Sequence, residues 1–195
     1  MVAEGGLTRL QLALLVLYGS VGWQRASAYS VEVFLRNMSG VVHFGKSAAY
    51  AQSRRLAKDG YLVAVMLEED RPRPTTAYRL SPKGKAAVEG WLLTPPDAAF
   101  REAELFLRLR ATSFVNAEVG LRGLSQMRPL FSKQLAVADA REVELGDRAE
   151  LCDQLEIRLT RSVTKARLSW LTRAEKGLRD EVRFQEREAR IAKLN

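Results

Sequence analysis

The positions of the prolines, which break helices, divide this sequence into two segments of different character. Five of the six prolines lie between Pro72 and Pro96, and only Pro129 follows them. Because proline lacks an amide hydrogen and clashes with the preceding helical turn, a nearly proline-free stretch of helix formers favours continuous helix. We therefore predict two modules with a boundary at Thr94-Pro95-Pro96. Residues 1–93 contain the turns, and residues 94–195 are all-helical.

Turn and cap signals within residues 1–93 predict three helices, a hairpin and a fourth helix. Thr8 can cap the first helix, Gly60 ends the third, and Ser81-Pro82 is a strong start for the fourth. Branched and aromatic residues on both sides of EEDRPRPT predict two strands. The expected helices span residues 8–18, 28–37, 46–59 and 82–93, and the expected strands span 61–67 and 76–80.

This order of elements is that of a winged helix-turn-helix domain. The predicted fold class is mainly α with a small β-hairpin: a winged helix-turn-helix DNA-binding domain at 1–93, then an all-helical dimerisation domain at 94–195. Leu7, Leu10, Leu14 and Leu17 recur at helical spacing, so the first helix is expected to be amphipathic. The second helix is expected to turn Tyr29 and Val33 inward.

The positive net charge of the chain favours an anionic partner. The formal net charge is +8 and the pI is about 9.9, with +5 (12 − 7) in residues 1–93 and +3 (19 − 16) in residues 94–195. Nucleic acid, here double-stranded DNA, is the commonest candidate and an acidic membrane surface is the next. The remaining alternative is a basic protein with no anionic partner. In a winged helix domain the third helix fits the major groove and the hairpin tip reaches the adjacent phosphates or minor groove.

Positive charge occurs at both of these places. In the third helix, Ala49, Ser53 and Leu56 form one narrow stripe that is expected to face the core, so the basic residues must lie on the outer face. The hairpin tip carries two arginines between prolines. The predicted DNA-binding residues are Lys46, Ser47, Tyr50, Arg54 and Arg55 on the helix and Arg71 and Arg73 on the hairpin.

Two segments of the sequence resemble a known protein family. KSAAYAQSRRLAKDGYL, followed by TTAYRLSPKGKAAVEGWL, resembles the core of the PadR family of bacterial transcription regulators. The matching positions are Tyr50, Arg55-Leu56, Asp59-Gly60, and Tyr78-Arg79-Leu80-Ser81 with Gly84. The segment FREAELFLRLR and a late helix with Leu168, Trp170 and Leu171 are similar to the branch with a longer C-terminal domain. Ala28 and Gly45-Lys46 depart from the family pattern, and the loop GSVGWQRAS is long for it.

The resemblance implies a homodimer that is held by the C-terminal helices and represses promoters, often its own. In some members of the family a phenolic or other hydrophobic small molecule releases the DNA. For this chain, the resemblance therefore implies a sequence-specific transcription regulator, a homodimeric repressor that binds an inverted-repeat operator. A hydrophobic or phenolic small-molecule effector is a candidate partner.

Apolar residues in the late helix lie on two opposite faces. Leu155, Leu159, Val163, Ala166 and Trp170 form one stripe, and Leu168, Leu171, Leu178 and Val182 form the other. A helix that is apolar on two sides has two surfaces to pack against. The predicted dimer interface comprises Leu155, Leu159, Val163 and Trp170. The alternative is that both stripes face one intrachain bundle, and the position of Trp170 is left open between the two.

Aromatic residues around the module boundary are candidates for an effector pocket. Trp91, Phe106 and Trp170 are the residues named for it, and the alternative is that they are ordinary core residues.

Enzymatic and metal-dependent functions find no support in the residue inventory. One cysteine, Cys152, and one histidine, His43, are too few for a disulfide or a zinc site, and no phosphate-binding glycine loop occurs. We expect no enzyme activity, no cofactor and no metal.

A cytoplasmic location without membrane contact is expected. Arg9, the apolar run 12–18 and Ala26-Ser27-Ala28 loosely mimic a signal peptide, but the leucine spacing favours a domain helix. The run is also far shorter than the roughly 20 residues that span a bilayer.

One alternative function shares the fold. A winged-helix module for protein–protein interaction keeps the same core but needs no basic wing. Neutralising Arg71 and Arg73 would leave its activity unchanged.

Overall fold

The computed structural model of the chain describes residues 6–20, 26–37, 47–67, 75–96, 101–146 and 150–192. The chain divides into two compact units, Met1–Gly120 and Leu121–Asn195. Each is described by itself below. The first unit extends beyond the Thr94 boundary expected from the sequence, because helix α5 (Arg101–Ala111) packs against helix α1 (Arg9–Gly19).

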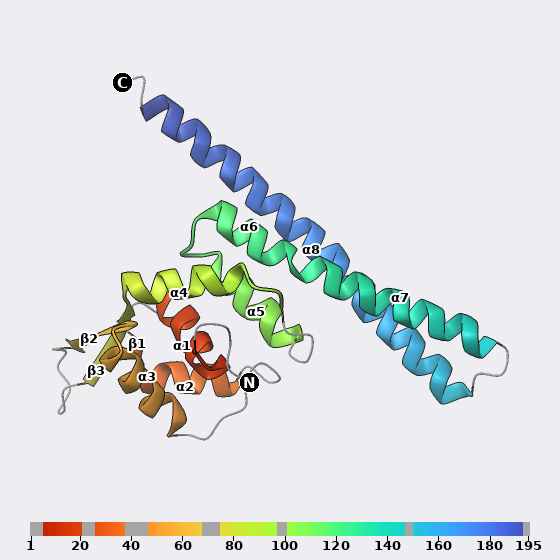
Figure 1. The fold of residues 1–195 in the computed structure, drawn as a ribbon, viewed down its shortest axis with the longest axis horizontal. Coiled ribbons are helices and arrows are strands. Elements are labelled where there is room, and N and C mark those ends of the chain that lie inside the picture. Colours follow the sequence, from red (N-terminus) through yellow and green to blue (C-terminus); the bar gives the residue numbers. More distant parts are fainter. Residues whose placement is uncertain are drawn as a thin grey trace. The chain divides into compact units, whose positions relative to one another are not determined.

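The first unit is a winged helix-turn-helix with one added helix (Figure 1). Its order confirms the predicted fold class, and it contains one element that was not predicted, the two-residue strand β1. Besides α1 and α5, the elements are β1 (Ala26–Ser27), α2 (Ala28–Asn37), α3 (Ala48–Lys58), β2 (Leu62–Leu67), β3 (Thr75–Leu80) and α4 (Pro82–Leu92).

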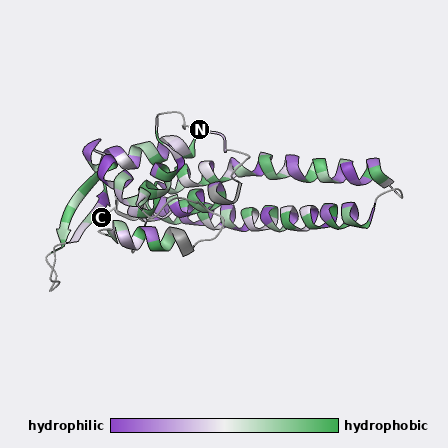
Figure 2. Cartoon of the chain, turned by 90° about the horizontal axis from the view of Figure 1, so that it is seen from below, coloured by the Kyte–Doolittle hydropathy of each residue, from purple (hydrophilic) through white to green (hydrophobic). Residues whose placement is uncertain are grey.

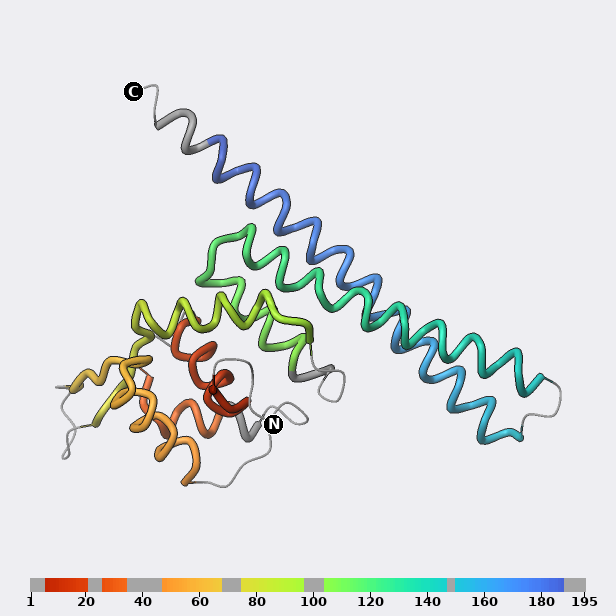
Figure 3. The backbone as a smooth tube through the Cα atoms, in the orientation of Figure 1, coloured from red at the N-terminus to blue at the C-terminus, as the bar shows by residue number. Residues whose placement is uncertain are grey.

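Helix α1 forms the centre of the first unit. Thr8 and Gln11 make a reciprocal capping box, in which each side chain accepts a hydrogen bond from the other residue's backbone amide. All residues from Gln11 to Gly19 are buried, so the helix is enclosed rather than amphipathic as expected. It contacts α3, α4, α5 and β3, and Figure 3 shows it in red among these elements.

Helix α2 buries a different face from the one expected. Ala28, Val31 and Glu32 are buried, whereas Tyr29 is 62% exposed. The prediction that Tyr29 turns inward was therefore wrong. The apolar residues gave the wrong inner face because the buried face of α2 includes the carboxylate of Glu32, which a hydropathy pattern assigns to the surface.

The three strands form one antiparallel sheet in the order β1-β3-β2. Leu62 pairs with Leu80 and Leu67 with Thr75, which defines the two arms of the wing. Gly60 has φ 79°, the left-handed conformation that lets the chain reverse from α3 into β2. Ser81 caps α4 by accepting a hydrogen bond from the amide of Gly84 at 3.0 Å.

The second unit contains most of the C-terminal helical domain, with α6 (Ala117–Ser125) spanning the division. Its two long helices are α7 (Met127–Leu145) and α8 (Leu151–Ala192). Ion pairs join Arg128 to Glu175 and Arg141 to Asp153, so residue numbers rise along α7 as they fall along α8. The two helices are therefore antiparallel, and they lie side by side in Figure 1.

The face of α8 that packs on α7 follows a heptad repeat. Alternating steps of four and three residues join its buried and half-buried positions, as in a coiled coil. These positions are Ile157, Arg161, Thr164, Leu168, Leu171, Glu175 and Leu178. Three of the seven are polar, and Figure 2 shows hydrophilic residues interrupting the hydrophobic ones along both helices. Arg161 pairs with Asp139 at 2.8 Å and also with Glu142.

Within the described residues, no helix is both long and apolar enough to cross a membrane.

Candidate nucleic-acid interface

Helix α3 is held by one buried face. Ala49, Ser53 and Leu56 are each 0% exposed, which confirms the narrow inward stripe expected from the sequence. The Tyr18 and Ser53 hydroxyls are hydrogen-bonded at 3.0 Å, and the Gln11 amide nitrogen donates to the Gln52 side-chain oxygen at 2.9 Å. Burial raises the pKa of Tyr18, so this phenol stays protonated. These contacts fix the rotation of α3 about its axis relative to α1.

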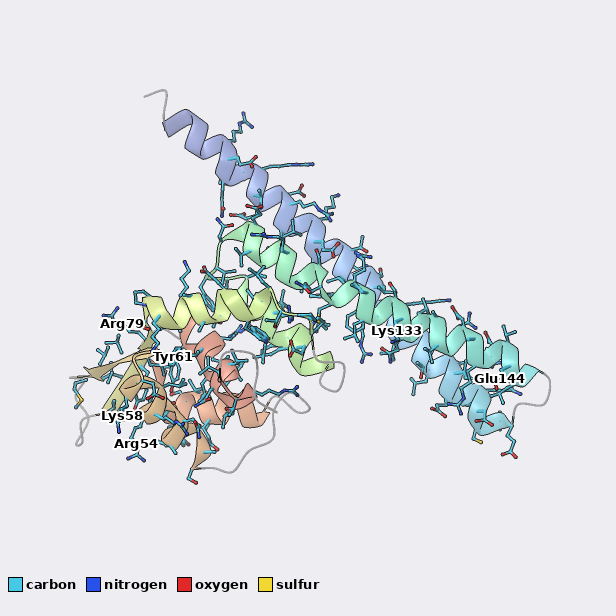
Figure 4. The ribbon with its side chains drawn as sticks, in the orientation of Figure 1. Arg54, Lys58, Tyr61, Arg79, Lys133 and Glu144 are labelled. Atoms are coloured by element: carbon cyan, nitrogen blue, oxygen red, sulfur yellow. The ribbon has the colours of Figure 1, made fainter. Side chains whose placement is uncertain are left out.

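The opposite face of α3 is exposed and basic. Residues about half a helical turn away from the buried stripe include three cations, Arg54, Arg55 and Lys58. Figure 4 shows Arg54 and Lys58 projecting outward from α3. Ser47, at the start of the helix, is also exposed, and its side chain makes no capping hydrogen bond. The outward face therefore carries donors at both ends of the helix.

These cations are only weakly engaged within the chain. Arg55 lies 3.8 Å from Asp59, but both side chains are well exposed, at 69% and 46%, so the pair contributes little. No ion pair to Arg54 or Lys58 occurs among the described residues. The positive charge of α3 is thus available to an external anion.

Tyr50 occupies the flank of α3 rather than its outermost face. It is 39% exposed and lines a hollow of about 580 Å³ beside the helix. Burial raises the pKa of Tyr50, and the Glu32 carboxylate and then Tyr29 raise it further. This hollow could not be predicted from the sequence, because its walls come from segments that are distant in the sequence.

The wing is described only in its two arms, β2 and β3. Lys46, Arg71 and Arg73, which are three of the predicted DNA-binding residues, lie outside the described residues. Their roles stay predictions. Ser47, Tyr50, Arg54 and Arg55 are brought together on α3.

The predicted dimer-interface residues lie on α8. Leu155 is 55% exposed, Leu159 65% and Val163 36%, and Leu151, one step earlier at the same four-residue spacing, is 71% exposed. Trp170 is half-buried in its own unit. The first three therefore form an apolar stripe that faces away from the heptad face of α8.

The predicted effector-pocket residues fall in both units. Trp91 is buried in the first unit with the Arg108 guanidinium 5.0 Å from its ring centre, and Phe106 is half-buried near Arg110. Trp170 belongs to the second unit. An effector pocket formed by these three residues stays a prediction.

Among the described residues, one group of side chains could hold a metal ion. Glu150, Cys152 and Asp153 place their ligand atoms within 4.8 Å of one another. Arg141 already pairs with Asp153 at 3.1 Å, and Cys152 is exposed. An arginine therefore already supplies positive charge to this acidic cluster.

No protein-family model and no curated protein match the chain. Its fold is similar to that of several solved structures with low sequence identity. Bacillus subtilis PadR in complex with operator DNA shares 16% identity, with a TM-score of 0.41, over 88% of this chain and 99% of that one.

Two further similar structures have comparable scores. The PadR-like transcriptional regulator BC1756 from Bacillus cereus shares 10% identity (TM-score 0.39, 89% of this chain and 99% of that one). The Vibrio cholerae virulence activator AphA shares 18% (TM-score 0.37, 89% and 99%).

Proposed function

We propose that this chain is a sequence-specific DNA-binding transcription regulator that acts as a homodimeric repressor. The third helix of a winged helix-turn-helix is the element whose size suits the major groove. In this proposal α3 enters the groove, the wing follows the neighbouring backbone, and the apolar stripe on α8 joins two copies. No chemical step on a substrate is involved.

The exposed basic face of α3 carries the proposal. Arg54, Arg55 and Lys58 lie opposite the buried stripe, and the Tyr18–Ser53 hydrogen bond keeps that face turned outward. A face that merely needed solubility would mix charges of both signs, but α3 contains no acidic residue from Ala48 to Lys58. The helix therefore suits a polyanion.

Different residues have different tasks in this proposal. Ser47, Arg54 and Arg55 are assigned to base edges, where each good contact discriminates by about 1–3 kcal/mol. Arg71 and Arg73 on the wing are assigned to phosphates or the minor groove, where they add affinity with little sequence information. Two copies related by a two-fold axis would read an inverted repeat with half-sites about 34–36 Å apart, or a multiple of that distance.

A titration of DNA with matched charge variants tests the assignment of α3. The test variant is Arg54→Gln/Arg55→Gln/Lys58→Gln. The control is Lys165→Gln/Lys176→Gln/Arg187→Gln, which removes the same charge from exposed positions of α8. We expect the test variant to lose at least about tenfold in affinity and to show a flatter dependence of log affinity on log salt concentration. We expect the control to retain both properties.

Equal behaviour of the two variants would contradict the proposal. In that case net charge alone would explain binding, and α3 would not lie on the DNA. If the wild-type chain bound no DNA and neutralising Arg71 and Arg73 left its activity unchanged, the protein-interaction alternative would be favoured.

A further inference from the structure

The hollow beside α3 is built from three separate segments of the first unit. It has a volume of about 580 Å³ and opens next to the basic face of α3. Its walls come from the start of α2, the flank of α3 and the wing strand β3. The residues that line it are Ser27, Ala28, Tyr29, Tyr50, Arg54, Thr75, Thr76 and Tyr78.

Nearly every side chain in this hollow can donate a hydrogen bond. Three phenols, three aliphatic hydroxyls and one guanidinium line it, and none of the lining residues is a carboxylate. Hydroxyls both donate and accept, but the guanidinium of Arg54 only donates and is always charged. A lining of this kind matches a group rich in acceptor oxygens with a negative charge.

Tyr78 is a largely buried residue whose hydroxyl can act as a donor. Its side chain is packed on the Tyr18 ring, with centroids 5.6 Å apart, and the residue is only 5% exposed. No hydrogen bond to its hydroxyl occurs among the described residues, whereas the Tyr18 hydroxyl is paired with Ser53. Tyr78 also lines the hollow, so its hydroxyl is placed to donate a hydrogen bond to a group bound there.

The start of α2 adds a fixed dipole to the same wall. Ala28 is the first residue of this ten-residue helix, and Ser27 accepts a hydrogen bond from the Ser30 amide at 3.1 Å. The first amides of a helix carry a partial positive charge that favours an anion. This dipole and the Tyr78 hydroxyl are independent features that favour the same kind of ligand.

We propose that the hollow seats one backbone phosphate of the bound DNA, held mainly by neutral hydroxyl donors. This inference rests on the proposed DNA-binding function and adds a contact that the sequence analysis did not assign. Tyr50 becomes a phosphate-positioning residue, instead of a residue that distinguishes bases. Arg54 stands at the boundary between the hollow and the basic face and contributes the charge.

The buried carboxylate next to Tyr50 is compatible with this assignment. Glu32 is 4% exposed and is not one of the lining residues. Burial, Glu32 and Tyr29 together raise the pKa of Tyr50, so its hydroxyl keeps its proton and can donate.

Variants that lack a single hydroxyl test the proposed phosphate site without changing any charge. The variants are Tyr50→Phe and Tyr78→Phe, with Tyr61→Phe as a matched control because Tyr61 does not line the hollow. We expect each test variant to lose about tenfold in affinity for operator and scrambled duplexes alike, with an unchanged salt slope. Arg54→Gln should in contrast flatten the slope. Circular dichroism and melting temperature verify that each variant is folded.

Neutralising single phosphates in the duplex identifies the contact directly. A series of duplexes, each with one methylphosphonate, should contain one position per half-site at which wild-type binding weakens. At that position Tyr50→Phe should show no further loss.

Two results would contradict the phosphate contact. If Tyr50→Phe weakened binding to the operator but not to scrambled duplexes, Tyr50 would be a base-reading residue. If both Tyr50→Phe and Tyr78→Phe kept wild-type affinity, the hollow would not be part of the DNA interface. Each result overturns this inference while DNA binding stands. Absence of wild-type binding overturns both.

Discussion

Ser53 is the residue through which the core fixes the orientation of α3. It is 0% exposed, and the Tyr18 hydroxyl is its partner at 3.0 Å. We predict that Ser53→Ala lowers the free energy of unfolding by about 1–3 kcal/mol, because the Tyr18 hydroxyl is left buried without a partner. The shift in the midpoint of urea unfolding measures this loss.

The double variant separates this explanation from a simple packing defect. Tyr18→Phe/Ser53→Ala removes both polar groups, which is expected to cost less than either single variant leaving its partner unpaired. If the double variant instead loses the sum of the two single-variant losses in unfolding free energy, the hydrogen bond does not couple these residues.

At the scale of elements, Arg108 joins α5 to the end of α4. The side chain is fully buried, donates to the Leu92 and Thr94 carbonyls at 2.8 Å each, and pairs with Glu104 at 3.1 Å. Burial lowers the pKa of Arg108, and Glu104 opposes this shift by favouring the charged form.

Arg108→Leu is predicted to destabilise the first unit by about 3–5 kcal/mol, because it leaves the Glu104 carboxylate buried and unpaired. Arg108→Lys keeps the charge, but an ammonium group cannot reproduce the planar set of hydrogen bonds that the guanidinium makes to the two carbonyls and Glu104. We therefore expect an intermediate loss of stability. Lys85→Gln, at an exposed position of α4, is the control. Thermal unfolding of the four proteins gives the order, and equal melting temperatures for Arg108→Leu and the control would contradict this role.

Local signals were sufficient for most elements of the first unit. Thr8, Gly60 and Ser81 act within a few residues of themselves, so the helix starts and turns that depend on them could be predicted. Strand β1 could not be predicted because two residues, Ala26 and Ser27, gain their strand character only by pairing with β3.

Features that depend on distant partners were missed. The heptad face of α8 contains Arg161, Thr164 and Glu175, whose polarity hides the repeat from a search for apolar residues. The hollow combines Tyr29, Tyr50 and Tyr78, which only the folded unit brings together. The candidate groove helix was predictable, since its buried stripe and basic face are both encoded within 46–59.

At the scale of the whole molecule, the exposed stripe on α8 predicts a homodimer of about twice 21.9 kDa. Leu155→Asp/Leu159→Asp should dissociate it, because an unpaired charge in a dry interface costs several kcal/mol. Both positions are exposed in the single chain, so the monomer should stay folded. Leu93→Asp, at an exposed position in the first unit, should leave the dimer intact.

Light scattering at micromolar concentration, with circular dichroism as the test of folding, decides this prediction. A monomeric wild-type protein would contradict the dimer. A double variant that remains dimeric would place the interface elsewhere on the molecule.

Sequence-specific DNA binding is the central claim, and capture of DNA by the unmodified protein tests it most directly. The purified chain is mixed with fragments of its own genome, and the retained fragments are sequenced. We predict enrichment of a few sites that share an inverted repeat, with half-sites one helical turn or a multiple of it apart. Recovery of fragments in proportion to their abundance, with no shared sequence, would contradict the claim.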